Sequence, residues 1–150
     1  MHVLFCVDGS EGAGRALMRG AAWLKNADVR AVVLHVIPEV DERFRHYERL
    51  HEQELREIEH LFGDEGHGLE VAVQARERLM KLGLEAERKV REGDPASEIL
   101  AEIREGTYDL VILASDAEGS IEDPRLGGVA DEVARTAPIS VLVVRGGVSQ

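Results

Sequence analysis

The sequence predicts one α/β domain with a doubly wound, five-stranded parallel sheet and helices on both faces. Apolar, strand-like runs alternate along the chain with segments of helical periodicity, and this alternation indicates parallel strands joined by crossover helices. Several runs are almost continuously apolar, as strands covered on both faces are. Right-handed crossovers place helices on both faces of such a sheet, and we expect the strand order 3-2-1-4-5, with the first and fourth strands side by side. With 150 residues, 44% of them hydrophobic, we expect a single domain over 1–145 and a tail over 146–150.

The first predicted strand runs from His2 to Val7, and a helix follows it. Ser10 is the expected N-cap of this helix, because a serine hydroxyl can accept a hydrogen bond from the first-turn amides. Small and apolar residues then recur every three or four positions from Ala13 to Leu24, which draws one buried stripe along the helix. We expect Trp23 to pack into the core near the end of this helix.

The second predicted strand is Arg30 to Ile37, and it contains His35 as a packed, hydrogen-bonded residue rather than a metal ligand. The charged stretch 39–82 fits two helical segments. Glycines between Gly63 and Gly68 predict a mobile loop that separates them.

The second half of the chain continues the alternation. Asp94 and Pro95 predict a helix start, because aspartate caps the first turn and proline suits its first position. We expect an edge strand with one solvated face over Leu84 to Val90, followed by a helix from Asp94 with Ile99, Leu100 and Ile103 facing inward. A strand over Tyr108 to Leu113 and an irregular segment over 114–125 come next. The last expected elements are a helix over about 126–136 and a strand over Ile139 to Val144.

Composition narrows the classes of function. The formal charge of −11, from 29 acidic against 18 basic residues, disfavours nucleic acid and anionic membranes as partners. The first residues carry no secretion signal, so we expect a cytoplasmic protein. Cys6 is the single cysteine, which excludes an intrachain disulfide, and its apolar surroundings in the sequence predict a buried, unreactive thiol.

The topology also predicts where a ligand would bind. Doubly wound sheets bind ligands beyond the carboxyl ends of the strands, at the point where the strand order reverses. Here that point lies between the first and fourth strands. It places residues 8–10 opposite residues 114–129.

Four fragments in this order resemble the universal stress protein family: Val7 to Glu11, Leu34 to Val36, Gly93 to Ala96 and Asp109 to Ile112, followed by Pro138 to Val144. The resemblance spans nearly the whole chain. It implies a Rossmann-like fold similar to that of the adenine nucleotide alpha hydrolases. It also implies a dimer through the fifth strand, where Val141 to Val144 offer an apolar edge.

Nucleotide-binding members of that family carry Gly-x2-Gly-x9-Gly-Ser/Thr after the fourth strand. In this chain the same register falls on Ala114, Ala117, Gly127 and Gly128, so one position of the four keeps the family's residue type. Left-handed dihedrals would cost roughly 1 to 2 kcal/mol at each alanine. By resemblance, Asp8 would contact the nucleoside and Val36 the adenine. The candidate nucleotide cleft comprises Asp8, Gly9, Ser10, Val36, Ala114, Ser115, Ala117, Gly127, Gly128 and Val129.

These observations favour a non-catalytic stress-response or signalling module with weak or no ATP binding. We expect no resident cofactor and no metal site, since no histidine pair has ligand spacing and no nucleophile motif occurs. We expect a homodimer, and an unidentified protein partner is compatible with such a role. The alternative is a protein that binds ATP or AMP, with Mg²⁺, and hydrolyses ATP slowly.

Overall fold

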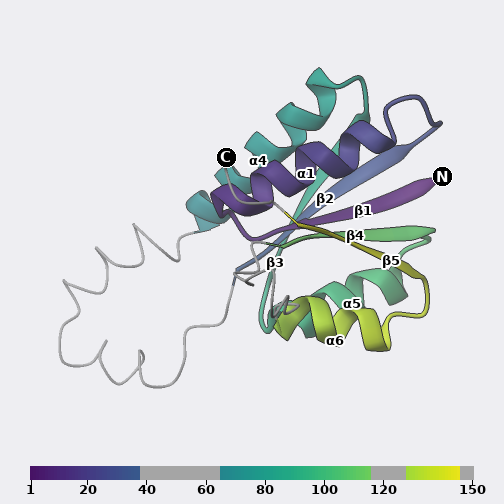
Figure 1. Ribbon diagram of the computed structural model, residues 1–150. Helices are drawn as coiled ribbons and strands as arrows, with labels where there is room; N and C mark the ends of the chain where they lie inside the picture. The colour runs from purple at the N-terminus through teal and green to yellow at the C-terminus, as the bar shows by residue number, and fades with distance from the viewer. Residues whose placement is uncertain (38–64, 116–127, 146–150) are drawn as a thin grey trace, which may run out of the picture.

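The computed structural model describes residues 1–37, 65–115 and 128–145, and it contains a five-stranded sheet in the order β3-β2-β1-β4-β5 (Figure 1). All neighbouring strands are parallel. The predicted fold class and strand order are therefore confirmed. The strands are β1 (His2–Val7), β2 (Arg30–Ile37), β3 (Glu85–Glu92), β4 (Leu110–Ser115) and β5 (Ser140–Arg145).

Two described helices cover each face of this sheet. Helices α1 (Glu11–Trp23) and α4 (Glu65–Lys81) lie side by side on one face, while α5 (Pro95–Glu105) and α6 (Gly128–Thr136) lie on the other (Figure 1). Each helix connects the carboxyl end of one strand to the amino end of the next. This is the geometry that right-handed crossovers impose.

Two helix starts follow the capping chemistry expected from the sequence. The Ser10 hydroxyl accepts a hydrogen bond from the Ala13 amide at 3.0 Å and so caps α1. The Asp94 carboxylate accepts hydrogen bonds from both the amide and the hydroxyl of Ser97, at 3.1 and 2.8 Å, and Pro95 opens α5. Local sequence therefore decides where both helices begin.

The core has two layers, one on each side of the sheet. On the α1 and α4 side, Phe5, Leu17 and Leu79 are almost completely buried. On the α5 and α6 side, Leu4, Val111 and Val133 are equally inaccessible. Because β1 contributes to both layers, all of its residues from Val3 to Val7 are buried, which explains its continuously apolar sequence.

The expectation for Trp23 was wrong, because this side chain is 61% exposed. Trp23 is the last residue of α1 and lies beside the buried stripe, whose final turn is formed by Gly20, Ala21 and Leu24. A Cβ at Gly20 would already lie 3.3 Å from Val144, so the helix packs too closely on the sheet to admit an indole there. The buried stripe of α1 therefore excludes Trp23 and is narrower than the sequence predicted.

Two boundaries also differ from those expected. The part of the predicted loop that the structure describes, 65–68, is helical, because these residues form the first turn of α4. Strand β4 continues through Ala114 and Ser115, which pair with Val144 and Arg145 of β5. Tertiary pairing therefore extends a strand into a segment that the sequence indicated as irregular.

Candidate functional site

The reversal of strand order brings β1 and β4 together in the middle of the sheet. Their register pairs Val3 with Leu110 and Cys6 with Leu113, so the two carboxyl ends lie at the same edge. The turn from β1 into α1 starts at that edge, directly after Val7. A ligand crevice is expected at such a position in a doubly wound sheet.

The turn after β1 is built from Asp8, Gly9 and Ser10. The Asp8 carboxylate is exposed, and its Oδ1 accepts a hydrogen bond from the Ser10 amide at 2.9 Å. Gly9 has a φ of +88°, which non-glycine residues rarely adopt. A Cβ on Gly9 would also lie 3.2 Å from a methyl carbon of Val71 in α4. The turn is thus fixed by its own hydrogen bonds, and it presents a carboxylate at the strand ends.

Strand β2 contributes Val36 and His35 at the same edge. Val36 is 7% exposed and packs in the core layer of α5 and α6, so little of its side chain is available to a ligand. His35 is buried on the opposite face, and its Nδ1 lies 2.9 Å from the carbonyl oxygen of Val7. The expectation that His35 is a packed, hydrogen-bonded residue is confirmed.

The β4 side of the candidate cleft is described only in part. Ala114 and Ser115 belong to β4, and within the described segments no residue other than glycine has a positive φ, so Ala114 carries no left-handed strain. Gly128 and Val129 open α6, where Val129 is 38% exposed and nothing lies within 4 Å of a Cβ built on Gly128. Ala117 and Gly127 lie outside the described residues.

A crevice of about 750 Å³ adjoins the turn on the α1 and α4 side. Of the predicted site residues that the structure describes, Gly9 and Ser10 line it and the others do not. The sequence analysis did not identify Arg15, Arg19 and Arg78 as site residues. Arg78 lies more than 50 positions after the other two, so no local sequence pattern connects it with them. The lining is formed by Val7, Gly9, Ser10, Gly14, Arg15, Leu17, Met18, Arg19, Val71, Gln74, Ala75 and Arg78.

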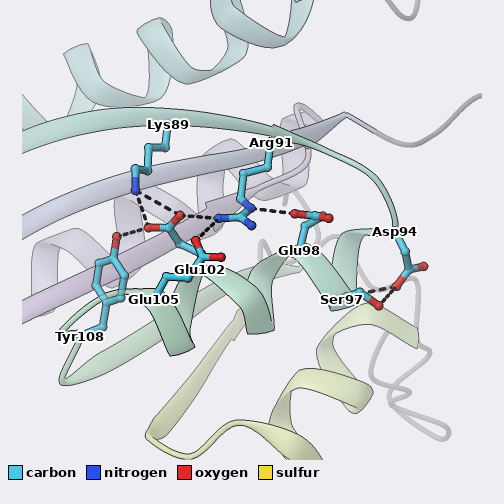
Figure 2. A network of polar contacts seen from close by, with 8 residues as sticks. All are labelled: Lys89, Arg91, Asp94, Ser97, Glu98, Glu102, Glu105 and Tyr108. Atoms are coloured by element: carbon cyan, nitrogen blue, oxygen red, sulfur yellow. Dashed lines mark hydrogen bonds and ion pairs between the residues drawn. The ribbon is translucent and has the colours of Figure 1, made fainter.

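A second feature missed from the sequence is a buried ionic network between β3 and α5, which Figure 2 shows at close range. Glu102 is 1% exposed. Its carboxylate accepts hydrogen bonds from Lys89 Nζ at 2.9 Å, Arg91 Nη1 at 3.0 Å and the Tyr108 hydroxyl at 2.7 Å. Arg91 also donates to Glu98 and Glu105, at 2.7 and 3.0 Å.

These contacts decide the ionisation of the buried groups. Burial alone would raise the pKa of Glu102, but the hydrogen bonds from Lys89, Tyr108 and Arg91 outweigh it and hold that pKa below its ordinary value. Burial, followed by the bond to Glu102, raises the pKa of Tyr108. The network therefore holds a carboxylate ionised inside the protein, and it fastens α5 to the edge strand.

The network has a signal in the sequence. Lys89 and Arg91 are two positions apart and so point to the same face of β3, while Glu98, Glu102 and Glu105 recur at the spacing of one helix face. These two patterns lie in separate elements, β3 and α5. They predict an ionic network only once β3 and α5 are known to pack together.

The side chains of His2, His35 and Cys6 are described, and each of these two histidines contacts a main-chain carbonyl oxygen. His2 Nδ1 lies 3.3 Å from the Thr107 carbonyl oxygen, and the His35 ring is bonded to a main-chain carbonyl, as described above. Cys6 is buried, as expected, and burial together with the charge of Glu102 raises the pKa of its thiol. A raised pKa disfavours the thiolate that nucleophilic or redox chemistry requires.

Within residues 1–37, 65–115 and 128–145, no group of three His, Cys, Asp or Glu side chains is arranged to hold a metal ion. In the same segments, no helix has both the length and the apolar character needed to cross a lipid bilayer.

Comparison with known proteins agrees with this geometry. The model of the universal stress protein family matches residues 1–145. The universal stress protein YxiE of Bacillus subtilis is 27% identical over 146 residues, which cover 95% of this chain and 97% of that protein.

Solved structures show the same fold. A universal stress protein from Archaeoglobus fulgidus superposes with a TM-score of 0.68 at 19% identity, covering 96% of this chain and 98% of that one. A universal stress protein family protein from Arabidopsis thaliana, solved with AMP bound, superposes with a TM-score of 0.65 at 18% identity, covering 96% and 90% of the two chains.

Proposed function

Because the chain belongs to the universal stress protein family, we propose that it is a non-catalytic regulatory module whose nucleotide cleft binds ATP only weakly. The observation that carries this proposal is the position of Asp8. Its exposed carboxylate stands at the β1 to β4 reversal and supports the nucleoside half of a cleft. The sequence that follows β4 does not supply the matching phosphate half.

The phosphate half is acidic in sequence. Residues 114–128 contain Asp116, Glu118, Glu122 and Asp123 against Arg125 alone, a net charge of −3. At a separation of about 8 Å and an effective dielectric constant near 40, each surplus acid costs a phosphate roughly 1 kcal/mol before salt screening. A total of about 3 kcal/mol would weaken binding roughly a hundredfold. Ala114 is unstrained as part of β4, so the weakening that we expect rests on charge and not on backbone strain at Ala114.

A second candidate function is adenine-nucleotide binding, with slow hydrolysis of ATP. The Arabidopsis relative that was solved with AMP favours it. AMP carries one phosphate and ATP carries three. Repulsion by the acidic residues should therefore weaken the binding of AMP less than the binding of ATP. We therefore expect any adenylyl ligand of this protein to be a monophosphate.

We also propose that the module is a homodimer paired through β5. Only one side of β5 is bonded within the described sheet, to β4. Val141, Leu142 and Val143 on it are only partly buried, and an unpaired apolar edge invites pairing with another strand. Sedimentation equilibrium tests this directly. A Val143→Lys variant should be monomeric, and an unchanged mass would contradict the proposed interface.

Calorimetric titration with AMP and ATP, each with and without Mg²⁺, tests the nucleotide part of the proposal. We expect dissociation constants near or above millimolar for ATP. Asp8→Asn should weaken AMP binding while it preserves the turn, because an amide oxygen can still accept the Ser10 amide hydrogen bond. Micromolar binding of ATP, or ATP hydrolysis that Asp8→Asn abolishes, would establish the second candidate instead.

A further inference from the structure

The crevice between α1 and α4 differs in charge from the rest of the protein. Among the twelve lining residues that belong to the described segments, three are arginines and none is acidic. The whole chain contains 29 acidic and 18 basic residues, so an acid-free lining runs against the average composition. The described lining thus contributes basic side chains and no acidic ones, which favours anions over cations as ligands.

Arg78 is placed on this crevice by the packing of the two helices. A Cβ on Gly14 of α1 would overlap Nη1 of Arg78, so the guanidinium crosses α1 only because position 14 has no side chain. Arg78 is exposed and makes no hydrogen bond or ion pair with another residue in the described parts of the chain. Its five N–H donors are thus available to a ligand.

Arg19 is held more firmly. Its Nη1 donates to the main-chain carbonyl of Arg145 at 2.7 Å, which fixes the guanidinium between α1 and the end of β5. A guanidinium held by one of its N–H groups still has others with which to bind an anion. The Gln74 amide also lines the crevice, and its Nε2 donates to the Glu70 carboxylate at 3.2 Å.

The rest of the lining is apolar. Val7, Leu17 and Ala75 form its buried part, while Met18 and Val71 are partly exposed. A crevice with apolar walls and cationic groups suits a ligand that has an apolar body and one anionic head. A simple ion such as phosphate would leave these walls solvated, and a neutral apolar molecule would make no hydrogen bond with the Arg78 guanidinium.

We propose that the α1–α4 crevice binds a small amphipathic anion, with a carboxylate or phosphate head held by Arg78 and an apolar body on Met18 and Val71. The crevice shares Gly9 and Ser10 with the candidate nucleotide cleft, but neither Asp8 nor Val36 lines it, so we treat it as a second site beside that cleft. Arginine binds both head groups through paired N–H donors, so carboxylate and phosphate are alternatives of one chemistry.

Titration calorimetry with four eight-carbon probes tests the proposal. Octanoate and octyl phosphate carry the two head groups, octanol is neutral and octylammonium is cationic. We expect both anions to bind, with the ratio of their affinities identifying the preferred head group, and we expect the other two to bind at least tenfold more weakly. Equal binding of octanol and octanoate would overturn the proposal.

Variants locate the binding. Arg78→Gln should weaken octanoate binding about tenfold, since it removes a charge-assisted hydrogen bond. Arg104→Gln is the matched control, because Arg104 is an exposed arginine of α5 on the opposite face of the sheet. An equal loss in both variants would show non-specific attraction and refute the site. Both positions are exposed, so neither substitution should prevent folding.

Competition with AMP separates this site from the nucleotide cleft. We expect AMP to leave octanoate binding unchanged, and we expect Asp8→Asn to reduce affinity for AMP without affecting octanoate. If AMP displaces octanoate, and Arg78→Gln weakens both ligands alike, the two sites are one and the separate crevice is refuted. Failure of AMP to bind at all would count against the second candidate function without touching this inference.

Discussion

Removing the cations around Glu102 should destabilise the protein more than removing Glu102 itself. The carboxylate is 1% exposed, whereas the side chains of Lys89 and Arg91 are 55% and 22% exposed. In Glu102→Leu both cations can turn toward water. In the double variant Lys89→Met with Arg91→Met, the buried carboxylate keeps only the Tyr108 hydroxyl as a partner.

The two costs follow from these contacts. Leaving a buried charge without its partner costs about 3 to 5 kcal/mol. Glu102→Leu strands the Tyr108 hydroxyl, which costs about 1 to 3 kcal/mol as an unsatisfied buried donor. The double variant should thus be less stable than Glu102→Leu by about 2 kcal/mol, or by about 4 to 8 °C in melting temperature for a chain of this size.

Urea denaturation followed by far-ultraviolet circular dichroism measures both free energies of unfolding. The pH dependence gives a second readout. Because the folded protein lowers the pKa of Glu102, the wild type should lose stability as the pH falls below about 4.5 and approaches that lowered pKa. In the double variant only the Tyr108 hydrogen bond opposes burial, so the pKa of Glu102 should rise and stability relative to wild type should recover as the pH falls. Equal destabilisation of the two variants at pH 7, with parallel pH profiles, would show that Lys89 and Arg91 do not stabilise the buried carboxylate.

Three further predictions concern single positions. Because the pKa of Tyr108 is raised in the folded protein, the free energy of unfolding should fall as the pH rises above 10. In urea denaturation, Tyr108→Phe should lose less stability over this pH range than the wild type. Identical alkaline profiles of the two proteins would contradict this prediction. Gly9→Ala should cost more than Gly83→Ala in thermal melts, since both glycines have φ near +87° but only Gly9 would place a Cβ against Val71; equal costs would show that the contact is relieved. The Cys6 thiol should react with Ellman's reagent only at the rate of unfolding, and rapid labelling of the native protein would show that the thiol is accessible.

The sequence predicted those parts of the fold that depend on local patterns. The continuous apolar run of β1 indicated a strand buried on both faces, and Ser10 and Asp94 marked helix starts that their own hydrogen bonds confirm. Trp23 was placed wrongly because its exposure depends on how closely α1 approaches the sheet. Periodicity gives the direction of a helix face but not the distance to its neighbour.

The candidate site was predictable to the same extent. Topology alone brought the turn after β1 to the β4 end, and the register confirms that both lie at one edge of the sheet. The crevice was not predictable from the sequence. It depends on a contact between Gly14 of α1 and Arg78 of α4, which are 64 positions apart in the chain. A contact of that kind carries no local signal, since neither residue alone departs from what a solvated helix face contains.

The charges at the carboxyl edge of the sheet bear on both proposals. Acidic residues follow β4 in the sequence, while arginines line the crevice beside α1, so we expect an anion to be repelled at the nucleotide cleft and attracted at the crevice. Repulsion at the first position and attraction at the second both weaken as salt rises, because exposed charges are screened beyond a distance of about 10 Å at 0.1 M ionic strength. Raising the salt concentration should therefore strengthen ATP binding at the nucleotide cleft and weaken octanoate binding at the crevice. Titrations at 0.05 and 0.5 M salt would show this crossing, and two affinities that move in the same direction would mean that the field of the whole protein, rather than the local residues, governs both sites.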